Sequence, residues 1–286
     1  MNIKRLLLST LSLSLIGASL TGCGEQKASV SAESTQVVKL GVVGSIYDEL
    51  WKPAQEQLKS EGIELEIVQF SDYATPNNAL NSGEIDLNAF QHQIYLDTEV
   101  ESYGYDVQSI GYTFIIPLNL YSNKVSSVEE IKDGDIVAIP NDVTNGGRAL
   151  KVLEAAGLIT LKADATNSPT KDDIESYNVK IVIKELAANT IPSALPDVTA
   201  AIVNGNYALD FGLKTEEAIY KDSVLEDSIY WNLIAARTSD LSDPTKVETY
   251  EKVVEAFQTE ATEKVFTDNY GGYFIKVGWD ENLLQK

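Results

Sequence analysis

Side chains able to bind or react gather in a few segments, and one segment holds the only histidine of the 286-residue chain. The segment NAFQHQIYLD, residues 88–97, places His92 between two glutamines, with Phe90 before it and Tyr95 after it. A single imidazole argues against the multi-histidine sets that hold many metals. Together with Tyr73, these residues predict an aromatic wall that suits an apolar or thioether side chain. In this interpretation His92 is a hydrogen-bonding wall residue; the alternative is a core histidine without a role.

A second segment, NDVTNGGRAL (residues 141–150), has the composition of a helix start next to an anion site. We expect Thr144 or Asn145 to cap this helix and the two following glycines to leave their backbone N–H groups accessible. Arg148 would then lie in the first turn, where the helix dipole disfavours a cation and a negative group nearby would offset it. A guanidinium beside free N–H donors is a receptor for a carboxylate, because the two groups match as a bidentate pair. The alternative is a surface arginine paired with one of the many acids.

Three asparagines offer further polar contacts. Asn204 and Asn206 lie in AIVNGNYAL, residues 201–209, where we expect a strand to end and a helix to begin. Ligand sites in α/β sheets gather at the carboxyl ends of strands, so either amide can accept a hydrogen bond from an ammonium group. We favour Asn206 for the ligand and regard Asn204 as a helix cap. Asn232 stands in the apolar run IYWNLIAAR, where an unpaired amide would cost about 1–3 kcal/mol; a satisfied core amide is the alternative.

The N-terminus predicts export and lipidation. Basic residues precede an apolar stretch at 6–20, and LTGC follows, ending at Cys23. This pattern is typical of a secretory leader, and the stretch is shorter than the roughly 20 residues that span a bilayer. LTGC resembles the lipobox of bacterial lipoproteins, in which the cysteine is diacylated and becomes the new N-terminus. We therefore expect a signal peptide at 1–22, a lipid on Cys23 and a flexible tether at 23–36; the alternative for Cys23 is an unmodified thiol in the leader.

Composition excludes several classes of function. With 22 basic and 43 acidic residues the chain carries a formal net charge of −21, which repels nucleic acid phosphates and anionic lipid headgroups. Because Cys23 is the only cysteine, the exported chain has no internal disulfide, and a core drawn from its 44% apolar residues has to stabilise it. We expect no nucleic acid partner and membrane attachment only through the lipid.

From residue 37 onward, short β-branched runs alternate with helical stretches, which predicts an α/β fold with mainly parallel sheets. The first elements form a βαβ unit with a strand at 37–43, a helix at 47–60 and a strand at 63–70. Further strands are expected at 84–90, 135–140, 179–183 and 199–203, and further helices at 146–157 and within 244–270.

Four of these segments together resemble a known family. DYATPNNAL with GEIDLNAFQHQIYLD, AIPNDVTNGGRALKVLEAAGLI, AAIVNGNYALDFGL and NLIAAR are similar to the NlpA/MetQ lipoproteins, the methionine-binding components of ABC importers. The resemblance covers nearly the whole mature chain. It implies a two-lobed periplasmic-binding-protein fold (type II-like), in which two α/β lobes joined by crossing strands close on a ligand. We expect lobe 1 to comprise 37–120 and 233–286, and lobe 2 to comprise 121–232.

The resemblance also implies a role for each candidate residue. The expected ligand-binding set is Tyr73, Phe90, His92 and Tyr95 for the side chain, Asn145 and Arg148 for the carboxylate, and Asn206 and Asn232 on the other lobe. The chain departs from the family pattern at Val143, where a proline is usual, and at Trp231, where a smaller residue is commoner. In addition, IIPLNLYS lacks the expected acidic residue ahead of its proline. These departures leave the carboxylate site intact and bear on side-chain selectivity.

A surface-anchored amino-acid-binding component of an importer accounts for the leader and for all the polar clusters. An enzyme accounts for fewer of them, because the chain has no GxSxG motif, no second histidine and a single cysteine at the processing site. A metal-binding lipoprotein would need more histidines, and a purely structural or adhesive one leaves Arg148 and Asn232 without a role. We therefore expect a zwitterionic amino acid as ligand, methionine first, with another amino acid or a short methionine peptide as alternatives. ABC permease and ATPase subunits are the expected partners. We expect the lipid to anchor the chain to the cell membrane, with the protein facing the periplasm or the extracellular side. No catalytic residue, cofactor or metal is expected.

Overall fold

The computed structural model describes residues 35–223 and 225–284 of the chain. The expected leader, Cys23 and nearly all of the expected tether lie outside these residues. Gln36, expected as the last tether residue, begins the first strand instead, and its N–H donates to the carbonyl of Gly62 at 2.9 Å. In the described part of the chain, no helix is long and apolar enough to cross a membrane.

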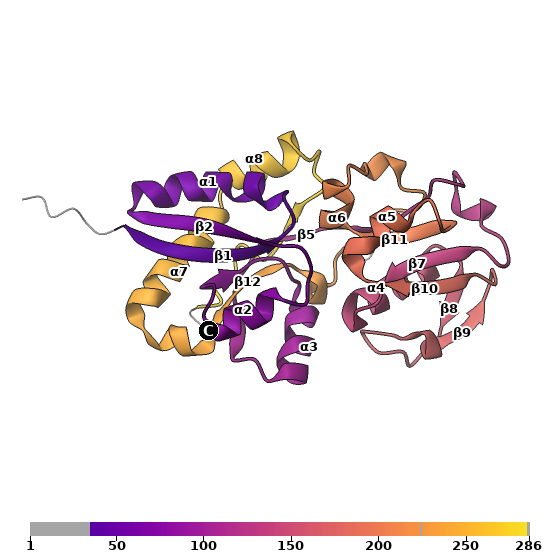
Figure 1. Cartoon of the computed structure of the whole chain (residues 1–286), viewed down its shortest axis with the longest axis horizontal. Helices are drawn as coiled ribbons and strands as arrows, with labels where there is room; N and C mark the ends of the chain where they lie inside the picture. The colour runs from indigo at the N-terminus through magenta and orange to yellow at the C-terminus, as the bar shows by residue number, and fades with distance from the viewer. Residues whose placement is uncertain (1–34, 224, 285–286) are drawn as a thin grey trace, which may run out of the picture. The chain divides into compact units, whose positions relative to one another are not determined.

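Two lobes, each with its own sheet, make up the described chain (Figure 1). Lobe 1 begins with β1 (Gln36–Val43), α1 (Tyr47–Ser60), β2 (Ile63–Phe70), α2 (Pro76–Ser82), β3 (Leu87–Asn88), α3 (Gln93–Tyr103), β4 (Val107–Tyr112) and β5 (Phe114–Ile115). Lobe 2 contains β6 (Leu118–Tyr121), β7 (Ile136–Pro140), α4 (Val143–Ala155), β8 (Ile159–Leu161), β9 (Ile174–Tyr177), β10 (Val182–Leu186), α5 (Ile191–Ala194), β11 (Ala200–Asn204) and α6 (Gly205–Asp210). The chain then returns to lobe 1 as β12 (Leu233–Arg237), α7 (Pro244–Phe257), α8 (Glu260–Asp268) and β13 (Ile275–Lys276).

The strand order is β2-β1-β3-β12-β4 in lobe 1 and β10-β7-β11-β6 in lobe 2. The central pairs are parallel, as predicted, but β12 pairs antiparallel with β3 and β4, and β6 pairs antiparallel with β11. Both antiparallel strands, β6 and β12, lie where the chain has just crossed from one lobe to the other. The sequence predicted mainly parallel sheets and gave no sign of these two antiparallel strands. Since β6 belongs to the second sheet, the first crossing falls at Ile116 and Pro117, ahead of the expected boundary at 120.

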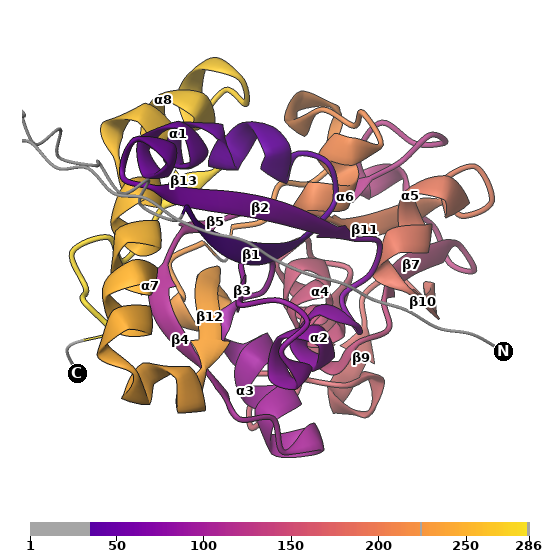
Figure 2. The same cartoon turned by 60° about the vertical axis from the view of Figure 1, so that its left-hand side comes forward.

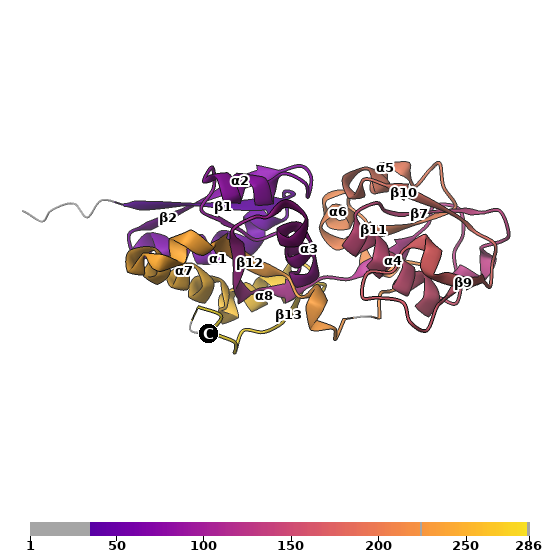
Figure 3. The same ribbon diagram turned by 90° about the horizontal axis from the view of Figure 1, so that it is seen from below.

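Alternating side chains on the strands build two cores in lobe 1. In β12, Ile234 and Ala236 face the core beneath α1, α7 and α8, whereas Leu233 and Ala235 face the core beneath α2 and α3. Figures 2 and 3 show these two groups of helices on opposite sides of the sheet. Each fully buried aliphatic side chain contributes about 1.5–3 kcal/mol, so a strand buried on both faces holds the two helix layers together.

A central strand of lobe 2 is likewise buried on both faces. In β7, Val137 and Ile139 pack in the core beneath α4, and Ala138 lies in a second cluster on the α5 side. That second cluster also contains Phe90 and Tyr95 of lobe 1. Apolar packing is therefore continuous between the lobes at the place where the predicted aromatic wall stands.

Most predicted elements are present, with four differences. The strand expected at 84–90 shrinks to the two residues of β3, and the strand expected at 179–183 lies three residues later, as β10. The helical stretch within 244–270 breaks into α7 and α8, because the Thr259 side chain caps a new helix by accepting the N–H of Thr262. The helix expected at 146–157 begins at Val143, with consequences for the site described below.

Arg237 at the end of β12 forms a largely buried ion pair with Asp240 and ties β12 to α2 through hydrogen bonds. Arg237 contacts Asp240 at 2.6 Å through Nη2, and its Nη1 donates to the carbonyls of Leu80 (2.7 Å) and Ile85 (2.5 Å). Asp240 also contacts Lys246 at 2.6 Å and accepts from the Tyr250 hydroxyl at 3.0 Å, so removal of Arg237 affects the two carbonyls most. Loss of a largely buried partner is more damaging than loss of an exposed ion pair.

We predict that Arg237→Ala lowers the free energy of unfolding by about 2 kcal/mol, because the carbonyls of Leu80 and Ile85 lose a donor and Asp240 keeps only Lys246 and Tyr250 as partners. Urea denaturation followed by tryptophan fluorescence measures the change. Lys264→Ala, which removes an exposed ion pair with Asp268, is the control and should leave the midpoint unchanged. Equal effects of the two substitutions would contradict this assignment.

Candidate functional site

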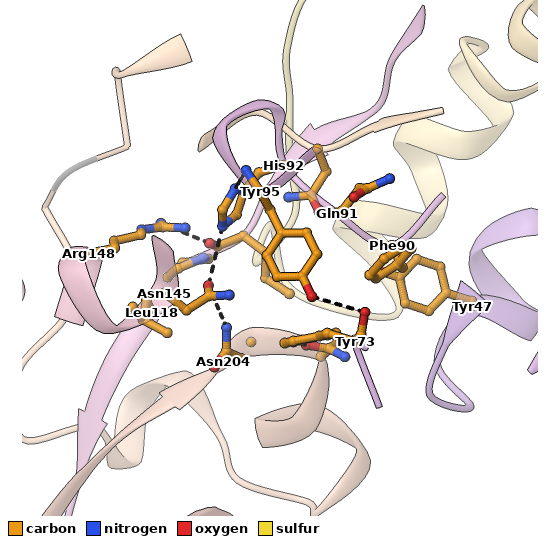
Figure 4. Close-up of a pocket in the computed structure, with 15 residues that line it drawn as sticks. Tyr47, Tyr73, Phe90, Gln91, His92, Tyr95, Leu118, Asn145, Arg148 and Asn204 are labelled. Atoms are coloured by element: carbon orange, nitrogen blue, oxygen red, sulfur yellow. Dashed lines mark hydrogen bonds between the residues drawn. The ribbon is translucent and has the colours of Figure 1, made fainter. Parts of the chain in front are cut away.

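One cavity between the lobes brings all eight predicted side chains together. Its empty space is about 440 Å³, part of it open to solvent. The lining consists of the eight predicted residues together with Tyr47, Gln91, Ile116, Pro117, Leu118, Asn204 and Gly205. Figure 4 shows Tyr73, Phe90 and Tyr47 on one side of this cavity and Arg148 with Asn145 and Asn204 on the other.

The aromatic wall comes from three short segments of lobe 1. Tyr73 follows β2, Phe90 follows β3, and Tyr95 lies in the first turn of α3. The ring centroids of Tyr73, Phe90 and Tyr95 lie 6.0–6.2 Å apart, and the Tyr95 ring meets both others edge-on. The Tyr95 hydroxyl donates to the carbonyl of Tyr73 at 3.0 Å, which holds the wall in place. These ring edges and faces provide the apolar surface that a flexible side chain requires.

His92 is the cap of helix α3, and this role determines its tautomer. Its Nδ1 accepts the backbone N–H of Tyr95 at 3.2 Å, so the proton of the neutral ring lies on Nε2. Nε2 in turn donates to Oδ1 of Asn145 across the cleft at 3.3 Å. Burial, with a smaller contribution from nearby Arg148, lowers the pKa of His92 to about 3. His92 is therefore a neutral donor at physiological pH and not a cation.

A row of amides continues from His92 into lobe 2. The Asp142 carboxylate can only accept, so Asn145 turns its Nδ2 toward it, at 3.0 and 3.2 Å. Oδ1 of Asn145 then faces the other way and accepts from His92 and from Nδ2 of Asn204, at 2.9 Å for the latter. As a result Asn204 keeps its own Oδ1 free of protein partners, and this atom is buried. Asp142 thus sets the orientation of two amides that line the cavity.

The start of α4 differs from the prediction. The helix begins at Val143 and is capped by Asp142, whose side chain accepts the N–H of Asn145 at 2.9 Å, so neither Thr144 nor Asn145 is the cap. The N–H of Gly146 donates to the carbonyl of Asp142 at 2.8 Å and is not accessible to a ligand.

The two glycines have a packing role instead. A Cβ on Gly146 would lie 2.9 Å from the carbonyl oxygen of Pro140, and one on Gly147 would lie 2.7 Å from Cα of Ser168. Only glycine therefore allows α4 to approach these backbone segments. Because the helix starts earlier, Arg148 lies in its second turn, and the argument from the helix dipole does not apply to it.

Arg148 is buried with only part of its hydrogen-bonding capacity used. Its Nη2 contacts Asp222 Oδ2 at 2.5 Å and donates to the carbonyl of Ile116 at 3.1 Å. The guanidinium carbon lies 4.8 Å from the centre of the Tyr230 ring, a cation–π distance. Only 3% of the Arg148 side chain is exposed, and its Nε is buried without a hydrogen-bond partner. A buried, unpaired donor on a cation next to a cavity is a place for an acceptor from a ligand.

Asn206 and Asn204 differ from the roles expected of them, because the Asn206 amide is already paired and Asn204, at the start of α6, does not cap that helix through its side chain. Asn206 accepts the Tyr73 hydroxyl at 2.5 Å and donates to the carbonyl of Val43 at 3.0 Å, so both ends of its amide already bridge the lobes. Asn204 makes no side-chain cap for α6, and its Oδ1 remains unpaired. Asn232 is held by its backbone, whose N–H donates to the carbonyl of Phe114 at 2.8 Å, while its side chain lines the cavity.

Of the departures from the family pattern, one reaches the cavity. Val143 is 61% exposed at the start of α4, and Trp231 packs edge-on against Tyr112 at 5.4 Å; neither lines the cavity. Ile116, which stands ahead of the proline where an acid was expected, does line it. A Cβ on Gly205 would lie 2.3 Å from Ile116, so that glycine is needed to admit the isoleucine.

Sequence reasoning missed Gln91, Tyr47 and Asp222. Gln91 neighbours His92 and belongs to a buried amide cluster, in which it exchanges hydrogen bonds of 2.7 Å with Asn77. Tyr47 gives no signal beyond the apolar face of its helix, and Asp222 stands in a polar loop far from Arg148 in sequence. In the described part of the chain, no group of three or more His, Cys, Asp or Glu side chains is arranged to hold a metal ion.

Comparisons with known proteins agree with this architecture. The family model of the NlpA lipoproteins matches residues 38–278. The chain is 37% identical over 270 residues to the D-methionine-binding lipoprotein MetQ of Salmonella typhi, covering 93% of this chain and 95% of that one. A nutrient-binding protein of Burkholderia cenocepacia, solved bound to methionine, is 39% identical with a TM-score of 0.78, over 84% of this chain and 99% of that one.

The substrate-binding protein of a methionine transporter from Streptococcus pneumoniae is also similar, with 33% identity and a TM-score of 0.80 over 84% of this chain and 95% of that one. Likeness at these identities confirms the predicted two-lobed substrate-binding-protein fold. The cavity between the lobes and the match along nearly all of the described chain lead to the same conclusion: the chain belongs to the NlpA lipoprotein family.

Proposed function

We propose that this protein captures an α-amino acid, methionine first, between its lobes and delivers it to the permease of an ABC importer. The observation that carries the proposal is the buried Arg148, whose Nε has no protein partner beside a cavity lined by aromatic rings. A carboxylate supplies the missing acceptor and matches the guanidinium in charge and shape. Two relatives support the choice of ligand, a D-methionine-binding lipoprotein and a nutrient-binding protein solved bound to methionine.

The remaining lining suits the other parts of an amino acid. Asn204, with its unpaired Oδ1, and Asn232 are acceptors for an ammonium group, and we assign this contact to them in preference to Asn206, whose amide is already used. Tyr73, Phe90 and Tyr95 form an apolar wall, and thioether sulfur packs favourably against ring edges. A ligand with an unbranched apolar side chain fits best; another amino acid or a short methionine peptide is the second candidate.

The remaining proposals concern the whole chain. We propose that it is a binding protein and not an enzyme, that a lipid on Cys23 anchors it to the cell membrane facing the periplasm or the extracellular side, and that permease and ATPase subunits complete the importer. We also propose that the lobes act as two domains, with boundaries near the crossings at 117 and 232. The family model and the transporter names of the relatives support these assignments.

We predict that protein refolded after washing in denaturant binds methionine in calorimetry with a stoichiometry near one. Lysine and arginine should bind poorly, because none of the described residues that line the cavity is an acid able to meet a cationic side chain. The assay covers the twenty amino acids, D-methionine and glycyl-methionine. If methionine in every form gives no heat while another solute binds, the proposed ligand is wrong.

Arg148→Ala should abolish binding and also destabilise the protein. The ligand loses a charge-assisted pair, which reduces affinity by at least about thirtyfold, and buried Asp222 loses its counter-ion, which lowers stability by about 3–5 kcal/mol. The double variant Arg148→Ala/Asp222→Asn separates the effects, because it removes the unpaired carboxylate. It should regain most of the stability in urea denaturation and none of the affinity. Binding by the double variant within about threefold of wild type would show that Arg148 does not contact the ligand.

Contacts outside the cavity also join the lobes. Asp210 at the end of α6 accepts from the N–H groups of Ser45 (3.0 Å) and Ile46 (3.1 Å) and from the Ser45 hydroxyl (2.7 Å). These groups lie at the N-terminus of α1, where the helix dipole favours an anion and where the helix has no side-chain cap of its own. Gly44 permits the approach, since a Cβ there would lie 2.2 Å from Asp210 Oδ2. A residue of lobe 2 thus caps a helix of lobe 1 only while the lobes are closed.

Asp210→Ala should lower the affinity for methionine about tenfold, because it weakens the closed form without touching the cavity. Asp243→Ala is the matched control: it removes the cap of α7, where Asp243 accepts the N–H of Thr245 at 2.9 Å, within lobe 1. That variant should lose about 1 kcal/mol of stability and keep its affinity. Unchanged affinity in Asp210→Ala would contradict a role in closure.

A further inference from the structure

We propose that Asp222 sets the charge selectivity of the cavity, so that a zwitterion is preferred over an anion with the same side chain. The inference rests on the proposed function, because it concerns the ligand that Arg148 receives. Asp222 does not line the cavity, so it acts on the ligand only through its ion pair with Arg148.

Asp222 is fixed by the protein and not by a ligand. Its side chain is fully buried, and Oδ2 accepts from Nη2 of Arg148 at 2.5 Å and from the N–H of Leu118 at 3.0 Å. Its own N–H donates to the side chain of Asn119 at 2.9 Å. Leu118 and Asn119 belong to β6, the strand that follows the first crossing between the lobes. The carboxylate is therefore held against lobe 2 and against the guanidinium at the same time.

The charges around the cavity explain why this pair matters. Arg148 is the only charged residue among those that line the cavity, since His92 is neutral at physiological pH. Asp142 lies behind Asn145, bound to its amide, and Asp222 pairs directly with the guanidinium. An unpaired cation in a low-dielectric site would attract any anion and repel an ammonium group a few ångströms away. With Asp222 in place, the Arg148 pair is neutral overall.

Arg148 nevertheless keeps its capacity to bind a carboxylate. Asp222 and the Ile116 carbonyl both use Nη2, and Nε is left without a partner. Asp222 balances the positive charge of Arg148 through Nη2, and the Nε–H of the same guanidinium stays available to a ligand. A ligand carboxylate can bind while the ammonium of the same ligand meets no uncompensated positive charge.

The test compares methionine with 4-(methylthio)butanoate, which has the same side chain and carboxylate but no ammonium group. Calorimetry gives the dissociation constants of both ligands for wild type and for Asp222→Asn. We expect the preference for methionine, the ratio of the two constants, to fall about tenfold or more in the variant, because the site gains a net positive charge. Loss of affinity for both ligands by the same factor would overturn the proposal and leave Asp222 a structural residue.

Further variants separate charge from packing. Asp222→Glu keeps the charge and should keep the ratio within about threefold, even if affinity falls. Asp240→Asn disrupts the comparable Arg237 ion pair in lobe 1 and should leave the ratio unchanged. If Asp222→Asn does not fold, Asp222→Ser replaces it, and an unchanged ratio in that variant also counts against the proposal. Failure of wild type to bind methionine would instead refute the proposed function; if another amino acid binds, that acid and its des-amino analogue replace the pair.

Discussion

The site depends on one constraint, the burial of a guanidinium group between two lobes. Arg148 has 3% of its side chain exposed, so its charge and its N–H donors have to be met inside the protein. Asp222, the Ile116 carbonyl and the Tyr230 ring meet most of this demand. The Nε that remains makes the protein incomplete without an acceptor from the cavity. In the proposed function a carboxylate-bearing ligand supplies this acceptor, so we expect it to stabilise the closed arrangement of the lobes.

Two carboxylates behind the cavity lining, Asp142 and Asp222, orient the polar groups of the site. Asp142 orients Asn145, which in turn orients Asn204, and His92 joins this row as a neutral donor from the other lobe. Neutral amides and a neutral imidazole offer directed donors and acceptors without adding charge. In our proposal, Arg148 and Asp222 together therefore set the net charge that a ligand meets. The aromatic wall adds surface without polarity. The arrangement separates recognition of the amino acid backbone from recognition of its side chain.

The sequence was sufficient for the elements whose signal is local. Buried β-branched runs predicted the central strands, and α1 and β2 begin and end at the predicted residues, because hydrophobic periodicity and burial coincide there. The predicted start of α4 was wrong because Asp142, Thr144 and Asn145 are all residue types that cap helices. Only the packing of α4 against Pro140 and Ser168 selects Asp142 among them. The role of Asn206 depends on Tyr73 from the other lobe, and Asp222 is paired with a residue 74 positions away. Such contacts depend on the tertiary structure and leave no periodic pattern in the sequence.

The central claim is that the buried cavity holds an amino acid by its carboxylate. The most direct measurement is to denature the purified protein and to identify by mass spectrometry the small molecule that is released. The account predicts a free α-amino acid, methionine first, in an amount approaching one per protein chain. Release of a molecule without a carboxylate group in that amount would contradict the account, because such a ligand leaves the Arg148 Nε without an anionic acceptor.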